Sequence, residues 1–175
     1  METLKEFLKQ VETLKSEQKF PEAIEKLEKM ITKINDNYRL YEELGDIYIF
    51  TGKFEKAEKA VDFALSINPD SPTGNYLKGF LMLGKKKLKQ SIVYLEKSNK
   101  LLPNNAEVLR NLGWAYNLDK QTSKGIYVLK RALNISPKDK LIMEDLAMAL
   151  IGADQAEEGN YLLSQIGKET IKHKN

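Results

Sequence analysis

The chain contains no cysteine among its 175 residues. That absence excludes disulfide bonds and thiolate metal sites, and it leaves the compartment open. Long apolar runs are also missing, because no stretch approaches the roughly 20 residues needed to cross a bilayer. The N-terminal stretch METLKEFLKQVETLKSEQKF carries charges throughout and lacks the apolar core of a secretory signal. We therefore expect a soluble, cytoplasmic protein that does not contact a membrane.

Motifs of enzyme chemistry are missing as well. The sole histidine, His173, lies in a lysine-rich tail, and the sequence shows no phosphate loop, nucleophile elbow or metal-ligand spacing. The net charge is only +3, which gives no reason to expect a nucleic-acid binder. We expect no enzyme activity, no cofactor and no metal. Apolar residues make up 42% and charged residues 30% of the chain, as in a globular protein, and the length favours one domain over residues 1–175.

What the chain does contain is an internal repeat. Pro69, Pro103 and Pro137 recur every 34 residues, and Gly45, Gly79 and Gly113 share that spacing. A repeat of this length indicates stacked supersecondary units. Without any insertion, the phase defines five repeats: 4–37, 38–71, 72–105, 106–139 and 140–173.

Within a repeat, the apolar spacing is helical. In the second repeat Tyr41, Leu44, Gly45 and Tyr48 fall at i, i+3, i+4 and i+7, the period of one helix face. The residues TGK at 51–53 interrupt the pattern, and a second helical pattern then runs until Pro69, which cannot continue a helix. Isolated helices of about 14 residues are marginal in water. The pairs must therefore stack on one another, which predicts an all-α solenoid.

Small residues recur at two positions of the repeat, and we expect them to let the paired helices approach closely. At position 8 the residues are Val11, Gly45, Gly79, Gly113 and Ala147, and at position 20 they are Ala23, Ala57, Ser91, Gly125 and Gly159.

This pattern resembles the tetratricopeptide repeat (TPR). The second repeat matches the family's preferences with Tyr41, Leu44, Gly45, Tyr48, Ala57, Val61, Ala64 and Pro69, and the fourth with Leu109, Leu112, Gly113, Tyr116, Leu129, Ala132 and Pro137. The third departs from them, because Asn75 and Lys78 replace apolar residues. The resemblance implies a right-handed α-solenoid of five TPR helix-turn-helix repeats, and a protein–protein interaction module that binds peptides on its concave surface.

Position 9 of the repeat accepts very different residues, with Asp46 in one repeat and Trp114, the only tryptophan, in another. It lies about 100° around the first helix from position 8, beside the packing stripe. The TPR resemblance implies that this second face lines the concave surface. We therefore predict a peptide-binding groove with an apolar centre and an acidic rim that favours basic flanks on the peptide. Its predicted residues are Tyr76, Phe80, Trp114, Met148, Glu42, Asp46, Arg110, Asn111 and Glu144.

The sequence also allows other interpretations of these residues. Leucines of the same face, such as Leu77, Leu83 and Leu118, could pack between helices instead of meeting a ligand. Tyr161, Leu162 and Ile166 could leave the end of the fifth repeat uncovered and drive assembly into a homo-oligomer. A chaperone for a secreted client is a third possibility. The basic run GKKKLK, residues 84–89, is interpreted as a solvated turn, because no aromatic residues are interleaved with it.

Overall fold

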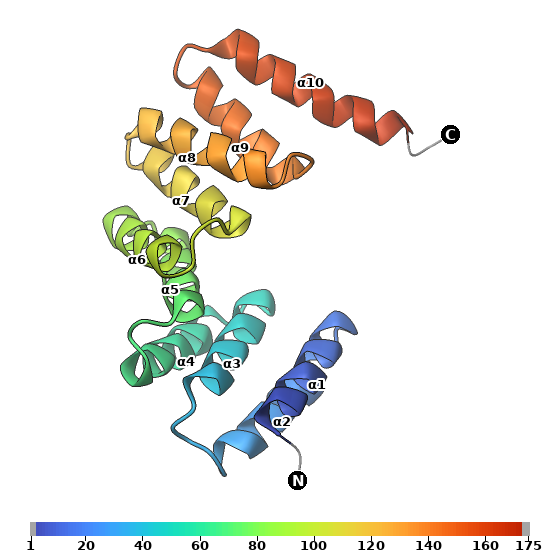
Figure 1. Ribbon diagram of the computed structural model, residues 1–175, viewed down its shortest axis with the longest axis vertical. Coiled ribbons are helices and arrows are strands. Elements are labelled where there is room, and N and C mark those ends of the chain that lie inside the picture. The colour runs from blue at the N-terminus through green and yellow to red at the C-terminus, as the bar shows by residue number, and fades with distance from the viewer. Residues whose placement is uncertain (1–2, 173–175) are drawn as a thin grey trace. The chain divides into compact units, whose positions relative to one another are not determined.

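The structure is a computed structural model that describes residues 3–172, and these residues form ten α-helices joined by short turns (Figure 1). His173 lies outside the described residues. The helices are α1 (Leu4–Ser16), α2 (Phe20–Ile31), α3 (Tyr38–Phe50), α4 (Phe54–Ile67), α5 (Pro72–Gly84), α6 (Leu88–Leu101), α7 (Ala106–Leu118), α8 (Thr122–Ile135), α9 (Lys140–Ile151) and α10 (Ala156–Lys172). The described range holds no strand, and the prediction of an all-α fold of helix-turn-helix pairs is confirmed.

The odd-numbered helices, called the A helices below, begin at residues 4, 38, 72, 106 and 140, where the five predicted repeats begin. The residue before several of these helices is a side-chain cap. Asn37, Asn105 and Asp139 each accept backbone N–H groups of the first turn of α3, α7 and α9. The even-numbered B helix closes each repeat. α10 continues to Lys172, beyond Ile166, where the repeat pattern fades.

The turn from each A helix to its B helix has a repeated geometry. One residue in every such turn adopts a left-handed conformation, with φ between 57° and 72°: Gln18, Gly52, Lys86, Lys120 and Asp154. A left-handed residue ends a helix because it turns the chain out of the helical path. In four of the five turns this residue has a side chain, so the geometry follows from the packing of the helix pair more than from glycine.

The helices belong to two compact units, Met1–Leu81 and Met82–Asn175. In the N-terminal unit α3 packs against α4, and in the C-terminal unit α7 packs against α8 and α9 against α10. Each unit is described by itself below. The right-handed sense of the solenoid and the single continuous domain stay predictions.

The small residues at positions 8 and 20 mark close approaches between helices, as predicted. In the C-terminal unit a Cβ added to Gly113 would lie 2.6 Å from Leu129 Cγ and 3.0 Å from the carbonyl oxygen of Gly125. In the N-terminal unit a Cβ added to Gly45 would lie 2.7 Å from Val61 Cγ2. Real side chains do not approach so closely, so an alanine at either position would push the A helix from its B helix.

The core of the C-terminal unit includes a contiguous cluster from three helices. Leu129 of α8 and Leu146 and Leu150 of α9 are buried, and Leu162 of α10 packs against them. The neighbouring Tyr161 is 63% exposed. The last B helix therefore covers the core with one side and turns an aromatic side chain outward with another.

The two polar residues that depart from the family pattern in α5 are both buried and paired. The Asn75 side chain donates to the carbonyl oxygens of Pro69 (2.9 Å) and Ser71 (2.7 Å). Lys78 Nζ forms ion pairs with Asp62 (2.6 Å) and Glu58 (3.2 Å) of α4. Each substitution thus exchanges apolar packing for a polar link within the N-terminal unit.

Candidate peptide-binding surface

The A helices separate a packing face from a second face, and positions 8 and 9 show the difference. Position 8 is buried in all five repeats, whereas position 9 is buried in none. Trp114 of α7 is half-buried although both of its chain neighbours, Gly113 and Ala115, are fully enclosed. The remaining residues at position 9 are Glu12, Asp46, Phe80 and Met148. The position therefore tolerates both a carboxylate and an indole because neither must enter the core.

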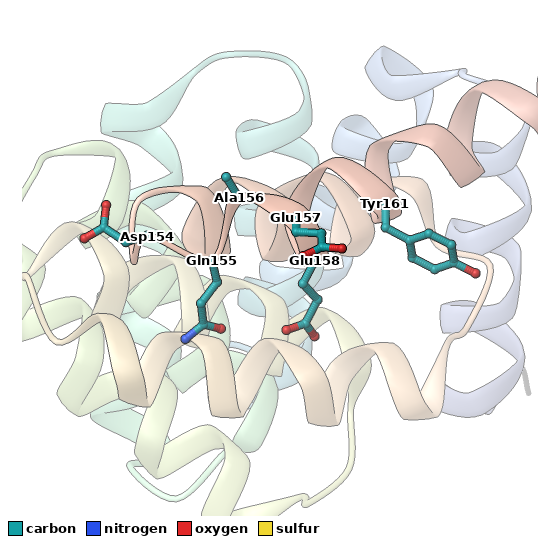
Figure 2. Close-up of a pocket in the computed structure, with 6 residues that line it drawn as sticks. All are labelled: Asp154, Gln155, Ala156, Glu157, Glu158 and Tyr161. Carbon is teal, nitrogen blue, oxygen red and sulfur yellow. The ribbon is translucent and has the colours of Figure 1, made fainter.

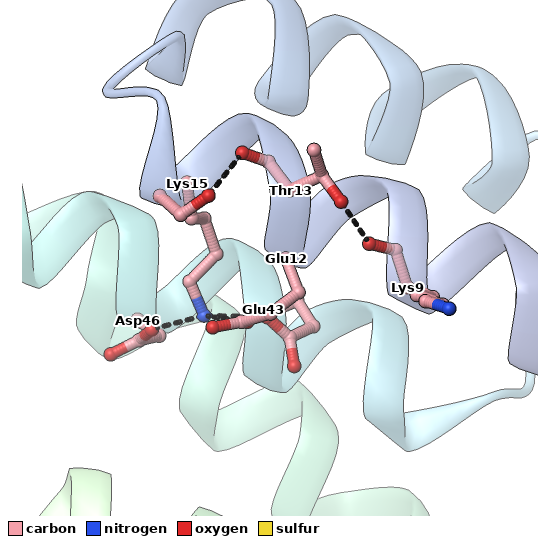
Figure 3. A network of polar contacts seen from close by, with 7 residues as sticks. Lys9, Glu12, Thr13, Lys15, Glu43 and Asp46 are labelled. Carbon is pink, nitrogen blue, oxygen red and sulfur yellow. Dashed lines mark hydrogen bonds and ion pairs between the residues drawn. The ribbon is translucent and has the colours of Figure 1, made fainter.

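In the N-terminal unit, a lysine from the first repeat lies among carboxylates of the second. Lys15 Nζ lies 2.7 Å from Asp46 Oδ2 and 2.9 Å from Glu43 Oε2 on α3, and 3.1 Å from Glu12 Oε2 on its own helix (Figure 3). Burial alone lowers the pKa of Lys15, but hydrogen bonds and charge from Asp46 and Glu43 outweigh burial and raise the pKa above its usual value. The predicted acidic position Asp46 is thus already engaged by an ammonium group from within the chain.

Glu42, predicted as part of the acidic rim, is only 6% exposed. Its carboxylate accepts a hydrogen bond from the Ser71 hydroxyl, just before α5, and Ser71 in turn accepts from the N–H of Gly74 at 3.3 Å. Burial raises the pKa of Glu42, and the bonds from Ser71 and Gly74 only partly offset it. A Cβ on Gly74 would lie 2.9 Å from Glu42 Oε1. The structure therefore places Glu42 in the packing beneath the start of α5 rather than on an open rim.

The aromatic residues predicted on α5 are both half-buried. The rings of Tyr76 and Phe80 lie one helical turn apart, with centroids 6.5 Å apart and planes inclined at 47°. Leu77, between them, is 3% exposed. Leu77 is therefore buried in the packing, as the alternative interpretation of the leucines on this face expects.

In the C-terminal unit an ion pair crosses from α7 to α9. Arg110 Nη1 donates to Asp145 Oδ2 at 2.9 Å, and both side chains are about one-fifth exposed, at 23% and 21%. Burial raises the pKa of Asp145, and the Arg110 charge offsets only part of that effect. The pair links the faces of two successive A helices. Arg110 is consequently committed to a neighbour within the chain.

The other predicted residues of this unit differ in exposure. Asn111 is 4% exposed, and its side-chain N–H donates to the carbonyl oxygen of Glu107 at 3.0 Å. Glu144 is exposed, Met148 is 56% exposed, and Leu118, which sequence alone left undecided, is 44% exposed. Trp114, Leu118 and Met148 therefore offer accessible apolar surface on α7 and α9, with Glu144 as an accessible carboxylate.

Three hollows of the described surface lie at turns between A and B helices. One is lined by Asp154, Gln155, Ala156, Glu157, Glu158 and Tyr161 at the start of α10 (Figure 2). A second is lined by residues 52–56, and a third by residues 86–90 with Asp119. Within residues 3–172, no group of three or more histidine, aspartate or glutamate side chains could hold a metal ion, and no helix is long and apolar enough to cross a membrane.

Sequence reasoning missed the polar links between repeats. Tyr48 donates to Glu28 at 3.3 Å, and Tyr116 donates to Glu96. In both cases the acceptor precedes the tyrosine by 20 residues, as Glu58 precedes Lys78. A search for polar residues 20 positions apart, with one in each of two successive repeats, could have revealed these pairs.

Comparisons with known proteins agree with this architecture. A sequence model of the tetratricopeptide repeat family matches residues 14–79. The chain is 28% identical over 139 residues to the BBSome complex member BBS4 of Bos taurus, covering 79% of this chain and 27% of that protein. It thus spans about a quarter of the length of that relative.

Two solved structures share the fold along most of the chain. MamA from Desulfovibrio magneticus RS-1, residues 41 to the end, superposes with a TM-score of 0.81 at 19% identity, covering 98% of this chain and 97% of that one. The type IV pilus biogenesis factor PilW superposes with a TM-score of 0.83 at 21% identity, covering 93% and 75%. At these identities the similarity concerns the fold alone.

Proposed function

The chain is a tetratricopeptide repeat protein, and from that premise we propose that it is an interaction scaffold that binds a peptide segment of a partner protein. Each unit offers a binding face of its own, formed by the second face of its A helices. Tyr76 and Phe80 supply apolar anchors in the N-terminal unit, and Trp114 and Met148 supply them in the C-terminal unit. The observation that carries the proposal is the exposure of position 9, which is buried in no repeat and apolar in the last three.

Aromatic anchors suit this role, because few large side chains usually carry most of the binding energy of an interface. Fully burying one apolar side chain stabilises a complex by about 1.5–3 kcal/mol. Trp114 and Phe80 are half-buried in the free chain, so a peptide bound to the face of either unit would cover the remaining area of the anchor there. Their inner portions are already fixed by packing, which limits the entropy lost on binding.

Fewer carboxylates are accessible to a peptide than the acidic rim predicted from the sequence contains. Glu144 is an exposed carboxylate that can attract a basic flank of the peptide, whereas Glu42 is buried and Asp46 is paired with Lys15. We propose that basic recognition lies mainly toward α9. A non-catalytic role and a cytoplasmic location, both predicted from the sequence, stay parts of the proposal.

Affinity capture from the native cell tests the proposal. Wild-type bait is compared with a Phe80→Ala/Trp114→Ala double variant, and the exposed Tyr127→Ala serves as a matched aromatic control, because Tyr127 lies on a B helix and is 65% exposed. We expect the control to retain the partner and the double variant to lose it. Equal capture by all three baits would contradict the proposal.

Self-assembly is the second candidate function, favoured by exposed apolar side chains of α10. Tyr161 and Leu163, which flank the packed Leu162 on α10, are 63% and 37% exposed, and exposed aromatic and aliphatic side chains on a terminal repeat favour association. Light scattering over a concentration series separates the two candidates. A mass that stays at one chain throughout would exclude self-assembly, whereas growth that Tyr161→Ser suppresses would support it. A chaperone for a secreted client is favoured by no observation on the described residues.

A further inference from the structure

The turn between α5 and α6 carries an unusual concentration of positive charge. Four lysines occupy five positions, Lys85, Lys86, Lys87 and Lys89 with Leu88 between them. All four lysines are exposed. Among the described residues, no carboxylate lies within ion-pair distance of Lys86, Lys87 or Lys89, although three of these lysines lie within four consecutive positions. Lys86, Lys87 and Lys89 are therefore not held by the fold's own charges, whereas Lys85 does have an interaction within the chain.

The fold does not require lysines here. The corresponding turn between α3 and α4 has Gly52 at the left-handed position where α5–α6 has Lys86, with φ values of 72° and 58°. A side chain in this conformation is disfavoured relative to glycine, so Lys86 stabilises nothing by its backbone. The turn between α9 and α10 instead presents Asp154, Glu157 and Glu158 (Figure 2). The sign of charge at such a turn is thus free to vary among repeats.

The lysines also surround a hollow. Lys86, Lys87 and Lys89 line it with Leu88 and Gln90, together with Asp119, the residue that caps the end of α7. Asp119 accepts a hydrogen bond from the Gln121 side chain at 2.7 Å, and this one carboxylate is outnumbered by the three lysines that line the hollow. Lys120, the next residue, is exposed and adds to the same charge. Leu88, which also lines the hollow, is half-buried and apolar.

We propose that this basic corner, defined by Lys86, Lys87, Lys89 and Lys120, is a second docking site, which binds an acidic peptide segment of a partner protein. The carboxylates of such a segment would take the place of the missing ion-pair partners, and an aliphatic stem would rest on Leu88. No aromatic side chain lines the hollow, so bases have nothing to stack on, and this favours an acidic peptide over a single-stranded nucleic acid. The site lies entirely in the C-terminal unit and is independent of the peptide surface on the A helices.

Fluorescence anisotropy with a labelled glutamate-rich peptide tests this site. The Lys86→Gln/Lys87→Gln/Lys89→Gln triple variant should bind roughly eightfold more weakly than wild type, because each exposed ion pair is worth about twofold in affinity. Binding should also weaken between about 50 mM and about 500 mM salt. A triple arginine variant at the same positions should bind as wild type does, since it keeps the charges.

The matched control neutralises the same number of exposed lysines at dispersed positions, as Lys33→Gln/Lys59→Gln/Lys138→Gln. It should retain most of the affinity. Equal losses in the two triple variants would overturn the proposal, because they would show an effect of net charge alone. Tighter binding to a single-stranded oligonucleotide or to phosphatidylserine vesicles than to the peptide, at equal ionic strength, would also overturn it. Salt-sensitive self-association that the Glu157→Lys/Glu158→Lys variant abolishes would overturn the proposal too. That result would identify a second copy of the chain as the occupant.

Discussion

Tyr116 of α7 donates a hydrogen bond from its hydroxyl to the carboxylate of Glu96 on α6. The same relationship links Tyr48 to Glu28 in the N-terminal unit. A lysine lies over each tyrosine ring, Lys124 at 5.4 Å from the Tyr116 centroid and Lys56 at 5.7 Å from the Tyr48 centroid. Each tyrosine is therefore held by packing, by a carboxylate of the preceding repeat and by a cation of its own repeat. This arrangement ties successive repeats together through polar contacts as well as through apolar packing.

Replacing the tyrosine by phenylalanine tests that link. Tyr116→Phe should lower the free energy of unfolding by about 1.5–3 kcal/mol at neutral pH, the usual net worth of a hydrogen bond to a charged group. The measurement is urea denaturation followed by circular dichroism. Tyr127→Phe, at an exposed site, is the control and should leave stability unchanged. A Tyr116→Phe protein as stable as wild type would show that the bond contributes nothing.

The same tyrosine predicts a loss of stability at alkaline pH. Burial, followed by the hydrogen bond to Glu96, raises the pKa of Tyr116 from 10.0 to about 12. A raised pKa means that the folded state favours the neutral phenol. The corresponding stability is complete below pH 10 and is lost as the pH rises toward 12. Denaturation midpoints measured across this interval should fall less steeply for Tyr116→Phe than for wild type, and parallel curves would contradict the assignment.

The close approach at Gly113 predicts a clear penalty for one methyl group. Gly113→Ala should destabilise the protein by about 1–3 kcal/mol, because the added Cβ would overlap Leu129 and the gain in helix propensity is at most about 1 kcal/mol. The control is Gly84→Ala at the end of α5, where an added Cβ meets nothing within 4 Å. Thermal denaturation of both variants measures the difference. Equal melting temperatures would mean that α7 and α8 are not packed as described.

The left-handed turn residues predict a stabilising substitution. Lys120 has φ of 63°, a conformation that glycine adopts without a Cβ clash. Lys120→Gly should raise the free energy of unfolding by up to about 1 kcal/mol, while Gly52→Ala should lower it by about 1 kcal/mol. Chemical denaturation of the two variants provides the test. Changes with the opposite signs would show that these turns are not left-handed in solution.

Lys78, the buried lysine of α5, predicts that removing the lysine and removing its carboxylate partners change the stability of the protein by unequal amounts. Lys78→Met places an apolar residue where the family prefers one, and it should change stability by no more than about 1 kcal/mol. Removing both partners, as Glu58→Ala/Asp62→Ala, leaves the ammonium group enclosed and should cost about 2 kcal/mol or more. Both variants are compared by urea denaturation. A larger loss for Lys78→Met than for the double variant would reverse this interpretation.

Local patterns in the sequence were sufficient to predict the helices and their packing face. The spacing of Pro69, Pro103 and Pro137 set the phase, and α3, α5 and α7 begin where that phase places them. Small residues at positions 8 and 20 correctly predicted the close approaches, because steric space within one repeat depends on residues of that repeat. These features are local, so one sequence contains the information that determines them.

The charged residues could not be placed in the same way. Glu42 and Glu144 occupy the same position in different repeats, yet Glu42 is buried under Ser71 and Glu144 is exposed. Likewise, Lys15 and Asp46 are 31 positions apart, and nothing in either helix alone indicates that they pair. Charged side chains on an amphipathic helix all look solvent-facing until the neighbouring helix is in place. The acidic rim predicted from the sequence was therefore wider than the accessible carboxylates the structure describes.

The proposed role of the A-helix face is tested most directly by the fluorescence of Trp114, the only tryptophan. The indole is half-buried beside the packing stripe, so a bound partner peptide should shift its emission to the blue and protect it from acrylamide quenching. The fluorescence change should saturate with the same affinity that calorimetry measures. An unchanged emission spectrum and unchanged quenching, in a complex that calorimetry shows to be formed, would contradict the account.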